Sequence, residues 1–155
     1  MKEKPKFGEE VRDIVDKFAE REGRRPRIML ANFGFTENDH DITETVTALA
    51  DMGFDVDMEP WGRNYIDVAQ DALDNDVHVI SVNSLKGEYK FLIVKLLEEL
   101  ASYDREDIII VVSGHVVAHS VIKELYGSGA SAVLVNKSYV DFAKEILSEL
   151  EIILF

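Results

Sequence analysis

The feature that most constrains the fold is a strict alternation of short apolar runs with stretches of helical periodicity. The apolar runs have strand length and cover residues 28–33, 54–58, 77–82, 108–112 and 132–135. Between and after them, apolar residues recur at helical spacing over 42–52, 65–73, 90–102, 116–126 and 139–150.

The run 108–112 reads Ile-Ile-Ile-Val-Val, so both of its faces are apolar. This is typical of a strand in a parallel sheet that helices cover on each side. The chain is therefore predicted to form an α/β fold, a doubly wound sheet of five parallel strands in the order 2-1-3-4-5 with flavodoxin-like topology.

An extra helix precedes this pattern. Apolar residues recur at helical spacing from Phe7 to Phe18, and the stretch ends at Gly23, before a basic linker that begins at Arg24. We expect a helix over 7–20 that packs outside the core unit. The chain then divides into an N-terminal helix and linker, 1–25, and one domain, 26–155.

Composition excludes several classes of protein. The 17 Lys and Arg stand against 30 Asp and Glu, and the net charge of −13 repels phosphate backbones, so no nucleic-acid partner is expected. The absence of Cys excludes disulfides, thiolate metal sites and a Cys nucleophile. No apolar run approaches the roughly 20 residues of a membrane span, and the start is polar. We expect no membrane partner and a cytoplasmic location.

Ligands of open α/β sheets bind outside the carboxyl ends of the strands, so the loops there are the candidate sites. The loop 34–41 places His40 just before a predicted helix, beside Asn38 and Asp41. A neutral imidazole binds transition metals while a neighbouring side chain orients its other nitrogen. The alternative is an Asp/Asn-rich turn that caps the next helix and leaves His40 solvated.

Three segments carry a family resemblance. Residues 23–31 read Gly-Arg-Arg-Pro-Arg-Ile-Met-Leu-Ala, 50–57 read Ala-Asp-Met-Gly-Phe-Asp-Val-Asp, and 76–80 read Asp-Val-His-Val-Ile. These segments resemble the C-terminal cobalamin-binding domain of methylmalonyl-CoA mutase and related acyl-CoA mutases. The resemblance covers nearly the whole chain. The resemblance implies that 26–155 hold adenosylcobalamin base-off, with a loop histidine replacing the dimethylbenzimidazole as lower cobalt ligand.

The ligand motif of that family, Asp-x-His-x-x-Gly, corresponds to 38–43, which read Asn-Asp-His-Asp-Ile-Thr. The resemblance makes His40 the metal ligand and puts Asn38, Asp41 and Thr43 at the cofactor. Asn38 can accept an imidazole N–H but lacks the charge of Asp. Thr43 stands where Gly lets the nucleotide tail approach the backbone.

The other family motifs also change. Ser-x-Leu corresponds to 83–85 (Asn-Ser-Leu), Gly-Gly to 114–115 (Gly-His), and Gly-Pro-Gly-Thr to 135–138 (Val-Asn-Lys-Ser). The resemblance places these further residues at the cofactor: Asn83, Leu85, Gly114, His115 and Ser138. Because side chains replace glycines at two places, the pocket is either reshaped or closed.

Two alternatives to a cobalamin-binding subunit or domain differ in how well the residues fit them. A phospho-acceptor receiver domain has the same topology, but Asn32 and Asn83 stand where its chemistry needs carboxylates. A degenerate domain that binds no cofactor and docks to a partner in a heteromeric mutase also fits. Either mutase hypothesis implies a substrate-binding barrel domain or subunit as partner, and no catalysis by this chain alone. His78 is predicted to be structural.

Overall fold

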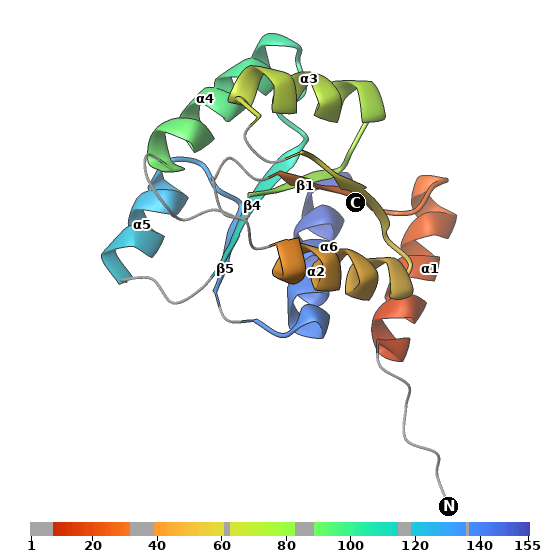
Figure 1. The fold of residues 1–155 in the computed structure, drawn as a ribbon. Helices are drawn as coiled ribbons and strands as arrows, with labels where there is room; N and C mark the ends of the chain where they lie inside the picture. Colours follow the sequence, from red (N-terminus) through yellow and green to blue (C-terminus); the bar gives the residue numbers. More distant parts are fainter. Residues whose placement is uncertain (1–7, 32–38, 61–62, 83–88, 115–118, 136) are drawn as a thin grey trace, which may run out of the picture.

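The computed structural model describes residues 8–31, 39–60, 63–82, 89–114, 119–135 and 137–155 (Figure 1). The strands are β1 (Arg27–Ala31), β2 (Asp55–Met58), β3 (Val79–Val82), β4 (Ile109–Gly114) and β5 (Ala132–Val135). The helices are α1 (Glu9–Glu22), α2 (Asp39–Asp51), α3 (Tyr65–Asn75), α4 (Tyr89–Ser102), α5 (His119–Gly127) and α6 (Tyr139–Leu154).

The described strands form one sheet in the order β2-β1-β3-β4-β5, and every neighbouring pair is parallel. This confirms the predicted flavodoxin-like topology. Several helix boundaries differ from the prediction by one to four residues. For example, α2 begins at Asp39 rather than at residue 42, and α6 continues to Leu154 rather than ending at 150.

Helices cover both faces of the sheet. Helices α1, α2 and α6 lie on one face, and α3, α4 and α5 lie on the other (Figure 1). In β1, Ile28 and Leu30 pack toward the first group, whereas Met29 and Ala31 pack toward the second. Alternate side chains of one strand thus enter two cores, which is why the strands are apolar on both faces.

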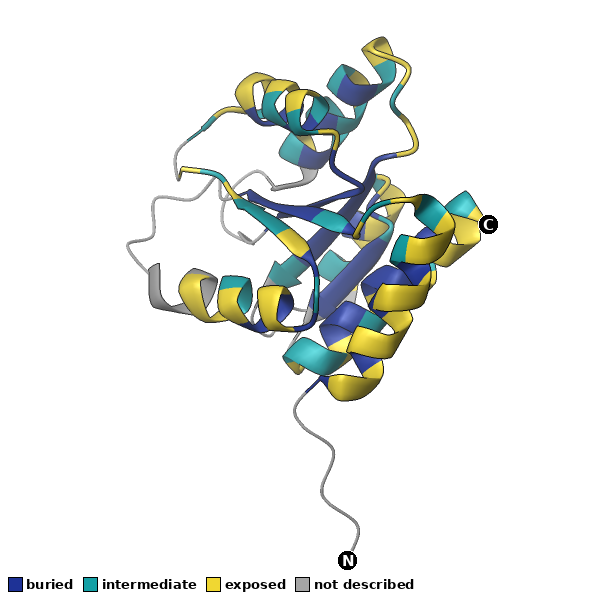
Figure 2. Ribbon diagram, turned by 90° about the vertical axis from the view of Figure 1, so that its right-hand side faces the viewer, coloured by how far each residue is buried: buried dark blue, intermediate teal, exposed yellow. Residues whose placement is uncertain are grey.

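Helix α1 belongs to one of these cores. Its buried residues Val11, Val15 and Phe18 are 0–3% exposed and share a hydrophobic cluster with Ile28 of β1 and residues of α6. The inner side of the α1 and α6 pair is accordingly buried and its outer side exposed (Figure 2). The expectation that this helix packs outside the core is wrong, because the apolar side of α1 packs against the sheet and α6.

The approach of α1 depends on the turn between α2 and β2. Gly53 has φ +100°, a conformation that residues with a side chain rarely adopt. A Cβ there would lie 2.9 Å from Cγ1 of Val15 and 2.7 Å from a guanidinium nitrogen of Arg25. The glycine therefore permits both the turn and the close packing of α1.

His78 lies at the amino edge of the sheet, directly before β3. Its Nδ1 accepts a hydrogen bond from the backbone N–H of Arg27 at 3.0 Å, and its ring meets Phe18 edge-on at 5.4 Å. The residue is 6% exposed, and its structural role is confirmed. Across the described residues, no helix has the length and apolar character needed to cross a membrane.

Candidate functional site at the carboxyl edge

The strand register brings three connections to one edge of the sheet. Ala31 is the register partner of Val82, and Val82 is the partner of Val112, so the chain leaves β1, β3 and β4 at neighbouring points. From β1 it continues to α2 on one face, and from β3 to α4 on the other. This divergence is a topological switch point, where open α/β sheets bind ligands.

The backbone of His40 lies at this edge, in the first turn of α2. The prediction that His40 precedes the helix is therefore corrected. Asp39 and Asp41 explain the earlier start, because negative charge stabilises the positive end of a helix dipole. The side chains of His40 and Asp41 are outside the described set. Thr43 is one turn further along on the same side of the helix, and it is exposed.

The remaining predicted residues divide into two groups. Asn38, Asn83, Leu85 and His115 lie outside the described residues. Gly114 ends β4, in register with Val135 of β5.

Ser138 has a local structural role. Its hydroxyl oxygen accepts a hydrogen bond from the backbone N–H of Asp141 at 3.1 Å, which makes Ser138 the N-cap of α6. A ligand that reaches this hydroxyl competes with the cap or receives the hydroxyl hydrogen, which the cap leaves available.

Two serines at this edge were missed by the sequence analysis as cofactor residues. Ser81 of β3 and Ser113 of β4 have their hydroxyl oxygens 3.4 Å apart, and Ser81 is 1% exposed. They alternate with Ile80 and Val112 and so face the layer of α2 and α6. The available signal was a single serine near the end of each apolar run.

A contact between helices lies near the same end of that layer. Tyr139, the first residue of α6, donates its hydroxyl hydrogen to Oε2 of Glu44 in α2 at 3.4 Å. The polar groups of Ser81, Ser113, Thr43 and Ser138 thus lie on the elements that border the carboxyl edge on one face of the sheet.

Among the described residues, no group of three or more His, Asp and Glu side chains can hold a metal ion. The side chains of His40, Asp41 and His115 lie outside this set.

Comparison with solved structures defines the class of fold. A crystal structure of a cobalamin-binding protein from Desulfitobacterium hafniense superposes with TM-score 0.66 and 12% identity, covering 92% of this chain and 69% of that one. A response regulator from Desulfuromonas acetoxidans gives TM-score 0.66 and 17% identity, covering 84% and 99%. These likenesses show a flavodoxin-like fold.

Comparison of sequences is more specific. The chain is 42% identical over 125 residues to the methylmalonyl-CoA mutase large subunit of Streptomyces virginiae, covering 81% of this chain and 17% of that protein. It is 40% identical over 154 residues to the probable mitochondrial methylmalonyl-CoA mutase of Caenorhabditis elegans, covering 96% and 21%. No protein-family model matches the chain.

The predicted resemblance to methylmalonyl-CoA mutase is therefore confirmed. The chain is similar to one segment of these enzymes, and it spans 17–21% of the length of the two relatives.

Proposed function

We propose that this chain binds cobalamin at the carboxyl edge of β1, β3 and β4 and serves as the cofactor-binding part of an acyl-CoA mutase. The observation that carries the proposal is the similarity to methylmalonyl-CoA mutases over 81–96% of the chain. The backbone position of His40, in the first turn of α2 at the carboxyl edge, also supports it, because a corrin-bound cobalt needs one protein ligand.

In this proposal His40 is the lower cobalt ligand, and the cofactor is held base-off. Asn38 or Asp41 accepts the second imidazole N–H and fixes the ring. The displaced base and its nucleotide tail contact the remaining residues: Thr43, Asn83, Leu85, Gly114, His115 and Ser138. Ser81 and Ser113 add hydroxyls on the α2 and α6 side of the sheet.

The chain's own residues bind and orient the cofactor. Adenosylcobalamin, when bound, supplies the radical chemistry of a carbon-skeleton rearrangement. The acyl-CoA substrate is then held elsewhere, by a barrel domain or subunit in the same cytoplasmic complex. Turnover of an acyl-CoA by the isolated chain loaded with adenosylcobalamin would refute this division of labour.

The test is a titration of the purified chain with hydroxocobalamin, followed by the absorption change that accompanies histidine ligation. We expect His40→Ala to remove this change and to weaken binding at least about 10–100-fold, the range found even for partners of ligands. The matched control is His119→Ala, which replaces an imidazole at the start of α5 and leaves the spectrum unchanged.

A second candidate function is a degenerate domain that docks to a partner without binding cofactor. The observation that favours it is the loss of glycine at 43 and 115 relative to the family motifs. No uptake by the wild-type chain would favour this alternative. Recovery of binding in the triple variant Asn38→Asp, Thr43→Gly and His115→Gly would then show that these departures closed the site.

A further inference from the structure

A cluster of charged groups at the end of β2 is not used by the proposed cofactor site. Glu59 directly follows β2, and its backbone N–H donates to the carbonyl of Leu30 at 3.0 Å, which ties it to β1. Its side chain is only 6% exposed. Its Oε2 is buried and has no hydrogen-bond partner among the described residues. A buried carboxylate oxygen without a partner is costly.

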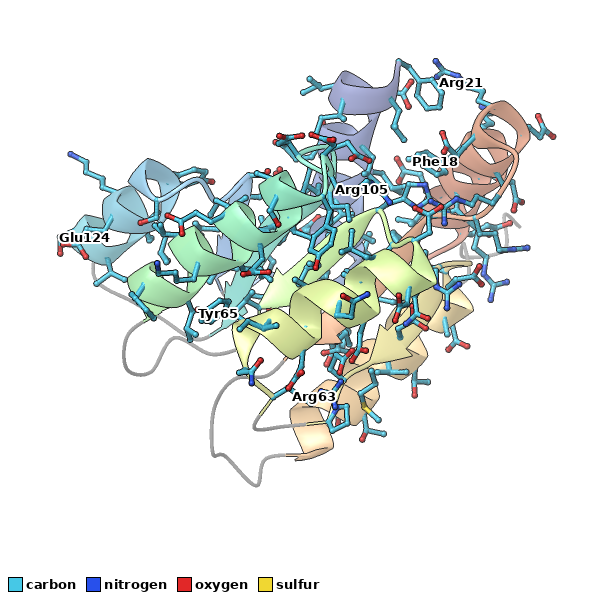
Figure 3. The ribbon with its side chains drawn as sticks, turned by 90° about the horizontal axis from the view of Figure 1, so that it is seen from above. Phe18, Arg21, Arg63, Tyr65, Arg105 and Glu124 are labelled. Atoms are coloured by element: carbon cyan, nitrogen blue, oxygen red, sulfur yellow. The ribbon has the colours of Figure 1, made fainter. Side chains whose placement is uncertain are left out.

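Arg63 lies between Glu59 and α3 and pairs mainly with Asp71. Its Nη2 contacts Oδ2 of Asp71, whereas its Nε lies 3.5 Å from Oε2 of Glu59, too poorly placed for a hydrogen bond. Figure 3 shows Arg63 close to the start of α3, where Tyr65 is also labelled. One guanidinium thus faces two carboxyl groups and satisfies one of them.

The other charged neighbours do not compensate Glu59. Asp57 of β2 contributes a further negative charge, although Arg27 binds it with two hydrogen bonds of 2.6 and 2.9 Å. Burial raises the pKa of Glu59 to about 7, and the hydrogen bond with Asp71 and the charge of Asp71 raise it further than Arg63 lowers it. Glu59 therefore holds its proton to a higher pH than an exposed glutamate does.

We propose that Glu59, Arg63 and Asp71 form a pH-dependent contact, called here the lock, between the end of β2 and helix α3. The contact is held when Glu59 is protonated and weakened when Glu59 is charged. When Glu59 carries a proton, it is neutral and shares a hydrogen bond with Asp71, so the cluster has one cation and one anion. When the proton leaves to solvent, the buried carboxylate of Glu59 and the partly exposed carboxylate of Asp71 compete for Arg63. The side chains of Glu59 and Arg63 then move apart, so that water reaches the carboxylate of Glu59.

The chain contains a built-in reporter for this lock. Its single tryptophan, Trp61, stands two residues after Glu59 in the sequence. We would record its fluorescence between about pH 5 and about pH 9 at constant ionic strength. The wild-type chain is expected to show a transition with a midpoint near 7, and Glu59→Gln is expected to keep the acid-side signal throughout.

Two further variants separate Glu59 from other groups. Asp71→Asn removes the neighbouring negative charge, so the midpoint moves to lower pH. Glu106→Gln, in the exposed turn before β4, is the matched control and leaves the transition unchanged. Circular dichroism at about pH 6 establishes that each variant is folded, and if Glu59→Gln is not folded, the shift in Asp71→Asn decides.

Carbon-13 NMR of the glutamate carboxyl groups gives the direct titration. The proposal requires one carboxyl, absent from Glu59→Gln, to titrate near pH 7, with the same midpoint as the Trp61 signal. It is overturned if Glu59 titrates with the exposed glutamates at about 4.3. It is also overturned if the Trp61 transition persists in Glu59→Gln or does not occur in the wild type. None of these measurements involves cobalamin, so the cofactor proposal stands or falls separately.

Discussion

Burial decides the charge of single residues at both edges of the sheet. At the amino edge, Nδ1 of His78 accepts from Arg27, so Nε2 carries the hydrogen of the neutral ring. This Nε2 lies 3.5 Å from Oε1 of Glu22 and is buried without a hydrogen bond among the described residues. Burial lowers the pKa of His78, the positive charge of Arg24 lowers it further, and Glu22 opposes both.

This lowered pKa predicts a pH dependence of stability with a definite sign. Below about pH 6.5 the unfolded chain binds a proton at His78 that the folded chain resists, so acid reduces the free energy of unfolding. His78→Asn keeps an acceptor for the Arg27 N–H but does not titrate. We expect the stability advantage of the wild type over His78→Asn to shrink as the pH falls.

Urea unfolding at about pH 7.5 and about pH 5.5 measures this difference. The contribution of Glu59 has the opposite sign, because its raised pKa makes the folded state lose stability as pH rises from about 4.5 toward 7. That contribution is common to both chains and cancels. A difference that stays constant with pH would exclude His78 as the cause.

Individual residues show which parts of the candidate site the sequence could predict and which parts it could not. His40 was found because it alone of the four histidines follows the first predicted strand and precedes the helix predicted from residue 42. Ser81 and Ser113 were missed as cofactor residues because only the strand register shows that they lie side by side. Ser138 was predicted at the cofactor, and its hydroxyl oxygen caps α6, a role that sequence spacing does not distinguish from ligand binding.

At the scale of elements, the strands were predicted well because short, continuous apolar runs bounded by polar residues are compatible with few structures other than a buried strand. The partner of α1 was not predicted, since an apolar stripe shows that one face is buried but not what covers it. The start of α2 was placed too late because Asp39, His40 and Asp41 add no apolar periodicity.

The role of α1 is testable at a single position. Phe18 is 3% exposed and contacts the rings of His78 and Phe155, so Phe18→Ala is expected to cost about 3–5 kcal/mol of unfolding free energy. Ile14 lies on the same helix and is 38% exposed, so Ile14→Ala is expected to cost less than about 1 kcal/mol. Denaturant unfolding compares them, and equal costs would mean that α1 is not part of the core.

On the scale of the whole molecule, the two edges of the sheet have different roles. The amino edge holds ion pairs such as that of Arg105 with Asp76, together with the buried His78. At the carboxyl edge, the carboxyl ends of β1, β3 and β4 lie beside small side chains that carry hydroxyl groups. Similarity to methylmalonyl-CoA mutases over most of the chain makes this second edge the place where we propose that cobalamin binds.

The most direct test of that claim is the electron paramagnetic resonance spectrum of the chain loaded with cob(II)alamin. The unpaired electron of the cobalt couples to the nucleus of its axial nitrogen ligand. If His40 is that ligand, labelling the protein with nitrogen-15 histidine changes each triplet splitting to a doublet, and His40→Ala abolishes the change. Triplets that persist in the labelled protein, or no uptake of cobalamin, would contradict the account.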